Sequence, residues 1–483
     1  MITAAQGAHA LHSRYNPAGE AEKYIASLEF REIPRFLILL EPGRGYMIPV
    51  LGRKFPDAKI LVIHAEAQDA PETGDLKIPP VYWTPDSGVS LERFLEQEIP
   101  DIEASAIKIV EWRPALAVYG ETYRRLLAET AAVIKRLDAN KRTTRAFGLR
   151  WFKNFFKILR AARRVIRQTG PAAGMPCVVA GAGPSLEESL PLVKNLKARN
   201  TLLVLGVSSS AGAFLAHDLV PDLIVTADGG GWALFHLYEC LRSGDRPFGF
   251  AASLFSALPS QCADTPLLLI SDGSFWQTLI LQSLNLPFIS LPQRGTVTAT
   301  ALDLAFSVTS GPVAITGMDL AHRDIRAHAR PNSLEQRLEE KACRFSPAYA
   351  RMFDRSYGIS AGGSLSVYAE WFSRQIPSYP KRLYAIGDNH PAFKDLKQWD
   401  PPVNGISGGH SPFGIRTIPA GTELAKQGKA ILLRALRAPQ TSARIRRELG
   451  PLLFPDDADL SLDKLCDRIS LSLKAYSGDA RYG

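Results

Sequence analysis

The sequence predicts an α/β protein: a central doubly wound, Rossmann-like domain, a smaller Rossmann-like N-terminal domain and a helical C-terminal region. From residue 176 onward, short apolar runs alternate with helix-length segments, which is the pattern of a parallel sheet covered by helices. A separate β-α-β pattern occupies residues 36–66. Residues after 418 show helical periodicity only, so we expect no further strands there.

Composition sets the broad class of the protein. The chain has 483 residues, of which 46% are hydrophobic and 22% charged, enough for two or three soluble domains. The 5 cysteines include no Cys-x-x-Cys pair, so we expect neither a zinc site nor a disulfide framework. We assign no metal ligand and expect no permanently bound cofactor. Residues 1–19 lack the apolar core of a secretory signal, and no apolar run is long enough for a membrane span. We therefore expect a cytoplasmic protein without stable membrane insertion.

The N-terminal β-α-β pattern contains a glycine-rich turn. Residues 36–40 and 59–64 are expected strands, and the turn at 41–45 reads Glu-Pro-Gly-Arg-Gly. With Glu66 after the second strand, the pattern is also that of a nucleotide or S-adenosylmethionine site. An anion in this turn would meet Glu41, which favours a structural role for the domain.

The next segment is strongly basic. Residues 135–167 hold 12 Lys and Arg against one acid, Asp138, and apolar residues recur among them at helical spacing. We expect residues 121–169 to be mostly helical. Three interpretations stay open: a linker helix with a solvated basic face, a surface for an acidic partner or substrate, and contact with nucleic acid or a membrane surface. No known nucleic-acid-binding module accompanies the segment, so nucleic acid is not an expected partner.

The central domain is predicted from its alternating elements. A Pro/Gly/Ala-rich break at 170–176 precedes it. Expected strands are 177–181, 201–207, 222–227, 248–251, 266–270, 287–291 and 312–317, and expected helices include 210–217, 275–284 and 297–309. Ligands of such sheets bind beyond the carboxyl ends of the strands.

The most informative stretch is 177–186, Cys-Val-Val-Ala-Gly-Ala-Gly-Pro-Ser-Leu. An apolar strand ends in glycines, and Ser185 with Glu188 three residues later has the spacing of a capped helix start. Glycines allow close approach of an anion, and a helix N-terminus offers unpaired N–H groups, so the turn predicts a phosphate site. It is neither the six-position dinucleotide fingerprint nor a Walker loop. A plain strand-to-helix turn is the alternative.

Several polar residues follow the other expected strands. These residues are Ser208, Ser209, Asp228, Asp272 and Asp319. They would hold ribose hydroxyls, a base edge or a divalent ion; the alternative is that they only cap helices or form turns. Thr296 and Thr298 open a helix, as a second anion contact or an N-cap. His328 follows the last strand in a loop, where its ordinary pKa of about 6.5 suits a general base, unless it has no role there.

The segments suggest five parts. These are an N-terminal Rossmann-like domain (residues 1–120), a basic helical linker (121–175), the central domain (176–330), its helical and loop extension (331–417) and a C-terminal helical region (418–483). In the extension we expect helices near 334–344, 349–353 and 364–375, a strand at 382–386 and loop from 388 to 417.

Four blocks together resemble the motility accessory factor (Maf) family of flagellin glycosyltransferases, which shares a domain with 6-hydroxymethylpterin diphosphokinase (MptE)-like proteins. The blocks are Gly-Ala-Gly-Pro-Ser-Leu at 181–186, Pro-Asp-Leu-Ile-Val-Thr-Ala-Asp at 221–228, Gly-Thr-Val-Thr-Ala-Thr-Ala at 295–301 and Gly-Met-Asp-Leu-Ala at 317–321, with His328 downstream. The likeness covers residues 176–330 well. The glycine triplet after Asp228 departs from the family pattern.

This resemblance implies a fold similar to bacterial CMP-sialyltransferases. It further implies transfer of a nonulosonic sugar, of pseudaminic or legionaminic type, from a CMP-sugar to Ser or Thr of flagellin or another protein acceptor. His328 would be the catalytic base and Asp319 would shape the catalytic site. The nucleotide sugar would be held by Gly181, Ala182, Gly183, Pro184, Ser185, Leu186, Ser208, Ser209, Asp228, Thr296 and Thr298.

Two other functions stay open. One is a pterin diphosphokinase that uses ATP and Mg²⁺ with Asp228 or Asp319 as ligand, although such an enzyme needs only the central domain. The other is a non-catalytic motility accessory protein that binds flagellin or a nucleotide sugar.

Overall fold

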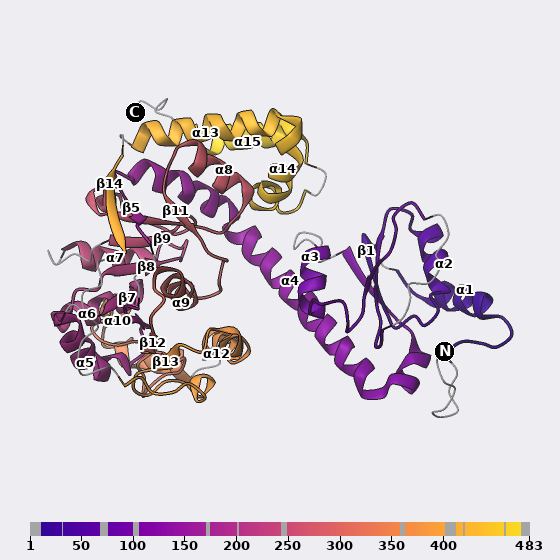
Figure 1. Ribbon diagram of the computed structural model, residues 1–483, viewed down its shortest axis with the longest axis horizontal. Helices are drawn as coiled ribbons and strands as arrows, with labels where there is room; N and C mark the ends of the chain where they lie inside the picture. Colours follow the sequence, from indigo (N-terminus) through magenta and orange to yellow (C-terminus); the bar gives the residue numbers. More distant parts are fainter. Residues whose placement is uncertain are drawn as a thin grey trace. The chain divides into compact units, whose positions relative to one another are not determined.

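The computed structural model describes residues 11–30, 32–67, 76–99, 106–170, 174–199, 202–242, 249–357, 363–400, 412–418, 421–457 and 460–474. The chain forms two compact units (Figure 1). One consists of Met1–Gly148 with Gly450–Leu460, and the other of Leu149–Leu449 with Ser461–Gly483. Each unit contains a sheet of its own, so the protein is α/β with a small N-terminal sheet and a large central one.

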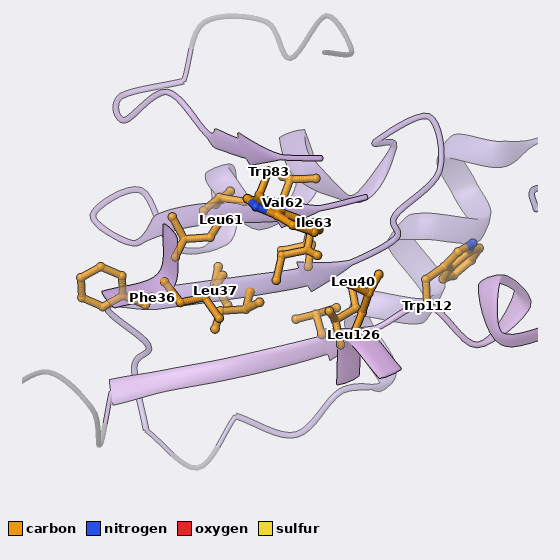
Figure 2. Close-up of a cluster of buried hydrophobic side chains, with 14 of the residues drawn as sticks. Phe36, Leu37, Leu40, Leu61, Val62, Ile63, Trp83, Trp112 and Leu126 are labelled. Atoms are coloured by element: carbon orange, nitrogen blue, oxygen red, sulfur yellow. The ribbon is translucent and has the colours of Figure 1, made fainter. Parts of the chain in front are cut away.

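The first unit is built on a small parallel sheet with strand order β3-β2-β1-β4. Its elements are α1 (Pro17–Ser27), β1 (Phe36–Leu40), α2 (Met47–Lys54), β2 (Lys59–Ile63), β3 (Val81–Trp83), α3 (Leu91–Glu98) and β4 (Ile107–Glu111). β1 has a partner strand on each side, and all five of its residues are buried. Figure 2 shows β1 and β2 side chains gathered with Trp83, Trp112 and Leu126 in one apolar cluster. The predicted N-terminal β-α-β unit is confirmed.

The basic segment belongs to helix α4 (Arg113–Ala161), which is interrupted at Gly120, where φ is +49°. On its second half, Phe152, Phe155 and Phe156 are fully buried. This confirms the buried apolar face expected of a linker helix.

The prediction that the helix continues to residue 169 is wrong at its end, where Arg164–Gln168 forms strand β5. This strand pairs in parallel with β10 (Leu267–Ser271) and antiparallel with β14 (Phe413–Thr417). Val165 and Ile166 are buried there, and their β-branched side chains fit the pleated surface of a sheet better than a helix. Residues 413–417, predicted as loop, are likewise a strand.

Within the described residues the central sheet has the order β13-β12-β6-β7-β8-β9-β10-β5-β14, and β11 pairs with β10. It is parallel except for β14. Its remaining strands are β6 (Cys177–Ala180), β7 (Leu203–Val207), β8 (Leu223–Thr226), β9 (Gly249–Ser253), β11 (Phe288–Ser290), β12 (Val313–Thr316) and β13 (Leu383–Ala385). Every strand predicted between 177 and 317 is confirmed.

Apolar cores cover both faces of this sheet. Alternate residues of β6 point to opposite cores, with Cys177 and Val179 on one side and Val178 and Ala180 on the other. The first core includes α9 (Val297–Val308) and α12 (Gly363–Gln375), and the second includes α5 (Leu186–Ala198) and α6 (Ala211–Ala216). Burial on both faces explains why the strands read as continuous apolar runs.

Helices make up most of the rest of the chain. They are α7 (Ala233–Arg242), α8 (Phe275–Ser283), α10 (Ser333–Glu340), α11 (Ala348–Tyr357), α13 (Gly421–Arg437), α14 (Pro439–Leu453) and α15 (Leu462–Ser472), with short 3₁₀ turns between. Helix α13 contacts both α8 and α15 (Figure 1). The predicted helical C-terminal region is confirmed, although its end at 475–480 and the predicted loop at 401–411 lie outside the described residues. Among the described helices, none is both long and apolar enough to cross a membrane.

Candidate functional site

The candidate site lies where the winding of the central sheet reverses. Strands β6 to β10 follow one another in one direction, whereas β12 and β13 lie on the other side of β6. Loops after β6 and β12 therefore diverge at the carboxyl edge, which is where ligands bind in open α/β sheets. These loops are the turn Gly181–Ser185 and the segment 317–332, which we call the β12 loop.

The glycines of the turn allow close contact with the β12 loop. The N–H of Gly181 donates to the Thr316 carbonyl and that of Gly183 to the Gly317 carbonyl, both at 2.8 Å. A Cβ at Gly183 would overlap Asp319 Oδ2 and come within 2.8 Å of the Gly317 carbonyl oxygen. Glycine is therefore required here by close contacts with the β12 loop.

Asp319 places a carboxylate at the start of α5. The Ser185 N–H donates to Asp319 Oδ2 at 3.0 Å, and the Ser185 hydroxyl donates to the same oxygen at 2.6 Å. Asp319 is only 7% exposed, and its charge is matched by Arg323 Nε at 3.2 Å from Oδ1 and by the positive end of the helix. The predicted side-chain cap by Ser185 is wrong, because its hydroxyl is used by Asp319.

Ion pairs fasten the β12 loop to the first turn of α5. Arg323 Nη1 lies 2.6 Å from Glu188 Oε1, and Arg326 Nη1 lies 3.3 Å from Glu187 Oε1. The Arg330 N–H also donates to Glu187 Oε1, at 2.8 Å. These contacts fix the loop over the turn.

His328 lies in this fastened part of the loop. The N–H of its neighbour Ala329 donates to the Ala182 carbonyl at 2.8 Å, so His328 stands beside the turn. Its side chain is half-buried. The structure therefore brings together Gly181, Ala182, Gly183, Pro184, Ser185, Leu186, Asp319 and His328.

A second histidine, His236 of α7, belongs to the same surroundings. Its Nδ1 lies 2.5 Å from the Ser333 hydroxyl of α10, and its side chain is 7% exposed. The pKa of His236 is lowered to about 4, chiefly by burial and also by nearby His328, while Asp228 opposes the shift. His236 is therefore neutral at pH 7, and it lies close to both His328 and Asp228. No local pattern indicates this role, because His236 lies within an apolar helix.

Helix α4 supports the loop that carries Asp228. The Asp228 side chain is exposed and accepts the Gly230 N–H at 2.7 Å. Buried Asn154 of α4 donates to the carbonyls of Gly229 and Phe255, at 3.3 and 2.9 Å. The basic helix thus shapes the carboxyl edge of β8 through its buried face.

Ser208 and Ser209 lie at the carboxyl edge of β7. Ser208 is buried, and the Ser209 carbonyl accepts from Asn332 Nδ2 of the β12 loop at 3.2 Å. Thr296 caps α9, since its hydroxyl accepts the Ala299 N–H at 3.0 Å, which is the capping alternative. Thr298 is half-buried on the same helix.

The N-terminal glycine turn is filled by the protein's own groups. The Arg44 N–H donates to His12 Nε2 at 3.0 Å, where an anion would otherwise bind. Buried Glu41 accepts the Ala65 N–H at 2.5 Å, and its other oxygen lies 3.4 Å from His64 Nδ1. These contacts support the structural interpretation of this turn.

The described residues hold no cluster of three or more His, Cys, Asp or Glu side chains arranged to bind a metal. Asp319 is a poor Mg²⁺ ligand here, because Arg323 and Ser185 already occupy its oxygens. Asp228 alone would supply one carboxylate.

Comparison with known proteins agrees with this geometry. Residues 149–324 match the family described as 6-hydroxymethylpterin diphosphokinase MptE-like. The chain contains an MptE-like domain. That domain covers β5 to β12 and includes the turn, Asp228 and Asp319. A Treponema pallidum (strain Nichols) protein, described as uncharacterized, is 28% identical over 303 residues, which are 62% of this chain and 64% of that protein. The match thus spans less than two thirds of that relative.

The whole chain is similar in fold to a solved glycosyltransferase. The structure of the MAf glycosyltransferase from Magnetospirillum magneticum AMB-1 matches 99% of this chain and 79% of its own, with a TM-score of 0.50 and 13% sequence identity. At this identity the similarity shows the fold alone. The MptE-like domain and the Maf-like fold agree with the family resemblance inferred from the four sequence blocks.

Proposed function

We propose that this protein is a glycosyltransferase that moves a nonulosonic sugar, of pseudaminic or legionaminic type, from a CMP-sugar to Ser or Thr of flagellin. The observation that carries the proposal is the fastening of the His328 segment against the Gly181–Leu186 turn at the switch point of the sheet. A titratable, half-buried histidine and a helix N-terminus meet there. The Maf-like fold supports it.

The proposed chemistry assigns one step to each group. His328 takes the proton of the acceptor hydroxyl, whose oxygen then forms a bond to the anomeric carbon of the sugar. The bond between that carbon and the phosphate oxygen breaks, and CMP leaves with the electron pair. Neutral His236 adds no positive charge beside His328.

The nucleotide is assigned to the same edge of the sheet. Residues Gly181–Leu186 form the wall for the phosphate, and Ser208, Ser209 and Asp228 place the cytidine. Because Asp319 holds the Ser185 donors, we assign it a positioning role, with the phosphate competing for those donors. Thr296 and Thr298 stand at the start of α9 as further proposed contacts.

The test is CMP release from a CMP-nonulosonate in the presence of flagellin, with the full chain and a His328→Ala variant. Loss of a general base should lower kcat about 10²- to 10⁴-fold while CMP affinity changes less than about twofold. His322→Ala, in the same loop, is the matched control and should keep its activity. Unchanged turnover of His328→Ala would remove the base assignment.

The family description favours a second candidate, a pterin diphosphokinase. That reaction uses ATP and Mg²⁺, and the contacts of Asp319 with Arg323 and Ser185 count against it as the metal ligand. Formation of AMP from ATP and 6-hydroxymethyl-dihydropterin, without CMP binding, would establish this function. Binding of an intact donor with no turnover would instead indicate a non-catalytic accessory protein.

A further inference from the structure

Among the described residues, Arg337 of α10 stacks on a ring but has no hydrogen-bonding or ion-pair partner. Its side chain is partly enclosed, and within the described residues it makes no hydrogen bond or ion pair, while its buried Nε also lacks an acceptor. Its Cζ lies 3.7 Å from the centroid of the Phe235 ring. A partly desolvated guanidinium normally has an acceptor for its N–H groups, so this arrangement points to an anion that is not part of the chain.

Two aromatic rings continue from this guanidinium to the surface. The centroids of Phe235 and Trp232 are 5.7 Å apart, and Trp232 is 61% exposed. We call Trp232, Phe235 and Arg337 the aromatic–arginine ladder. An exposed indole is costly to leave in water, and its flat face suits the apolar face of a sugar ring.

The ladder borders the proposed active site. Phe235 precedes His236 on α7, and Arg337 is one turn after Ser333 on α10, where Ser333 and His236 are in contact. Trp232 follows the Asp228–Gly231 loop directly. A ligand on the ladder would therefore lie near His236, which in turn is close to His328 and Asp228.

We propose that the aromatic–arginine ladder selects a carboxylated sugar: the Trp232 ring stacks on the pyranose, and Arg337 pairs with the sugar carboxylate. This inference rests on the proposed glycosyl transfer and names the feature by which the donor is chosen. A guanidinium forms two parallel N–H···O bonds with a carboxylate, so it discriminates an acid from its neutral ester. A neutral sugar would leave Arg337 without a partner.

The test compares a sugar acid with its neutral ester on the full chain. N-acetylneuraminic acid, its methyl ester, CMP and CMP-N-acetylneuraminic acid are titrated calorimetrically or by ligand-observed NMR. The wild type should bind the acid about 10-fold or more tightly than the ester, as expected for charge-assisted hydrogen bonds. Arg337→Met should abolish this preference, and Trp232→Ala should weaken acid and ester by the same factor. Arg374→Met, at an exposed position of α12, is the control and should behave as the wild type.

The outcomes separate this inference from the proposed function. The inference is overturned if Arg337→Met still binds the acid more tightly than the ester. It is also overturned if this variant loses affinity for CMP by the same factor as for CMP-N-acetylneuraminic acid, because Arg337 would then hold the phosphate. If the wild type binds neither CMP nor the CMP-sugar, the proposed function fails, and the free acid and ester still decide the ladder. Should Arg337→Met lose its folded circular-dichroism spectrum, Arg337→Lys replaces it, and an undiminished acid preference in that variant overturns the inference.

Discussion

The contact between Asp319 and Ser185 fixes the geometry of the candidate site, so its removal should lower the local stability of the turn. Asp319→Asn keeps the size of the side chain but removes its charge. The carboxylate accepts the Ser185 N–H at 3.0 Å and the Ser185 hydroxyl at 2.6 Å, and it pairs with Arg323 at 3.2 Å. All three interactions are affected by the substitution.

The magnitude follows from these contacts. A hydrogen bond to a charged group contributes about 1 kcal/mol more than one between neutral groups, and three such bonds are converted or lost. The stability of the turn should therefore fall by about 3 kcal/mol, which corresponds to about 100-fold faster exchange of the Ser185 amide hydrogen. Hydrogen exchange with mass spectrometry on peptides covering 177–190 of the full chain measures this locally.

Asp388→Asn is the matched control. Asp388 also faces Arg323, but at 3.9 Å and with 88% of its side chain exposed, so its loss should change stability by less than about 0.5 kcal/mol. A double-mutant cycle with Ser185→Ala should give a coupling energy of about 1–3 kcal/mol with Asp319→Asn. Equal exchange in wild type and Asp319→Asn, or a coupling energy near zero, would refute the assigned role of Asp319.

Two further predictions concern His236 and Gly183. Because the pKa of His236 is lowered to about 4, the unfolded chain binds a proton between pH 6.5 and 4 that the folded protein does not bind. The unfolding free energy of the wild type, measured by urea titration, should therefore fall by about 2 kcal/mol from pH 7 to 5. The unfolding free energy of His236→Gln should fall less over the same pH range. An equal pH dependence in both proteins would contradict the assigned burial of His236. Gly183→Ala places a Cβ against Asp319 and should lower the free energy of unfolding, measured by thermal unfolding, by about 1–3 kcal/mol. Gly231→Ala has open space around its Cβ and should be close to neutral. Similar melting of the two variants would show that the turn tolerates a side chain.

The elements that could be predicted from sequence are those whose pattern is local. Strands such as Cys177–Ala180 are continuous apolar runs because both faces of the sheet are covered, and that pattern needs no knowledge of the fold. β5 was mispredicted because Val165 and Ile166 continue the spacing of the preceding helix. Only their pairing with β10 and β14 decides in favour of a strand.

The candidate site depended on longer-range contacts. Ser185 and Glu188 have the spacing of a helix cap, but Asp319, 134 residues away in the chain, uses the serine hydroxyl instead. The roles of His236 and Asn154 arise from packing of α7 against α10 and of α4 against the β8 loop, which no local pattern reveals. One signal was available: the arginines at 323, 326 and 330 recur every three or four residues after Asp319, and Glu187 and Glu188 start α5.

The central claim is that the carboxyl edge between β6 and β12 binds a cytidine nucleotide. Calorimetric titration of the full chain with CMP, set beside ATP and 6-hydroxymethyl-dihydropterin, tests it most directly. We predict saturable heat with CMP that disappears when Gly183 is replaced by Val. Heat with ATP or the pterin alone, or with none of the three, would contradict it.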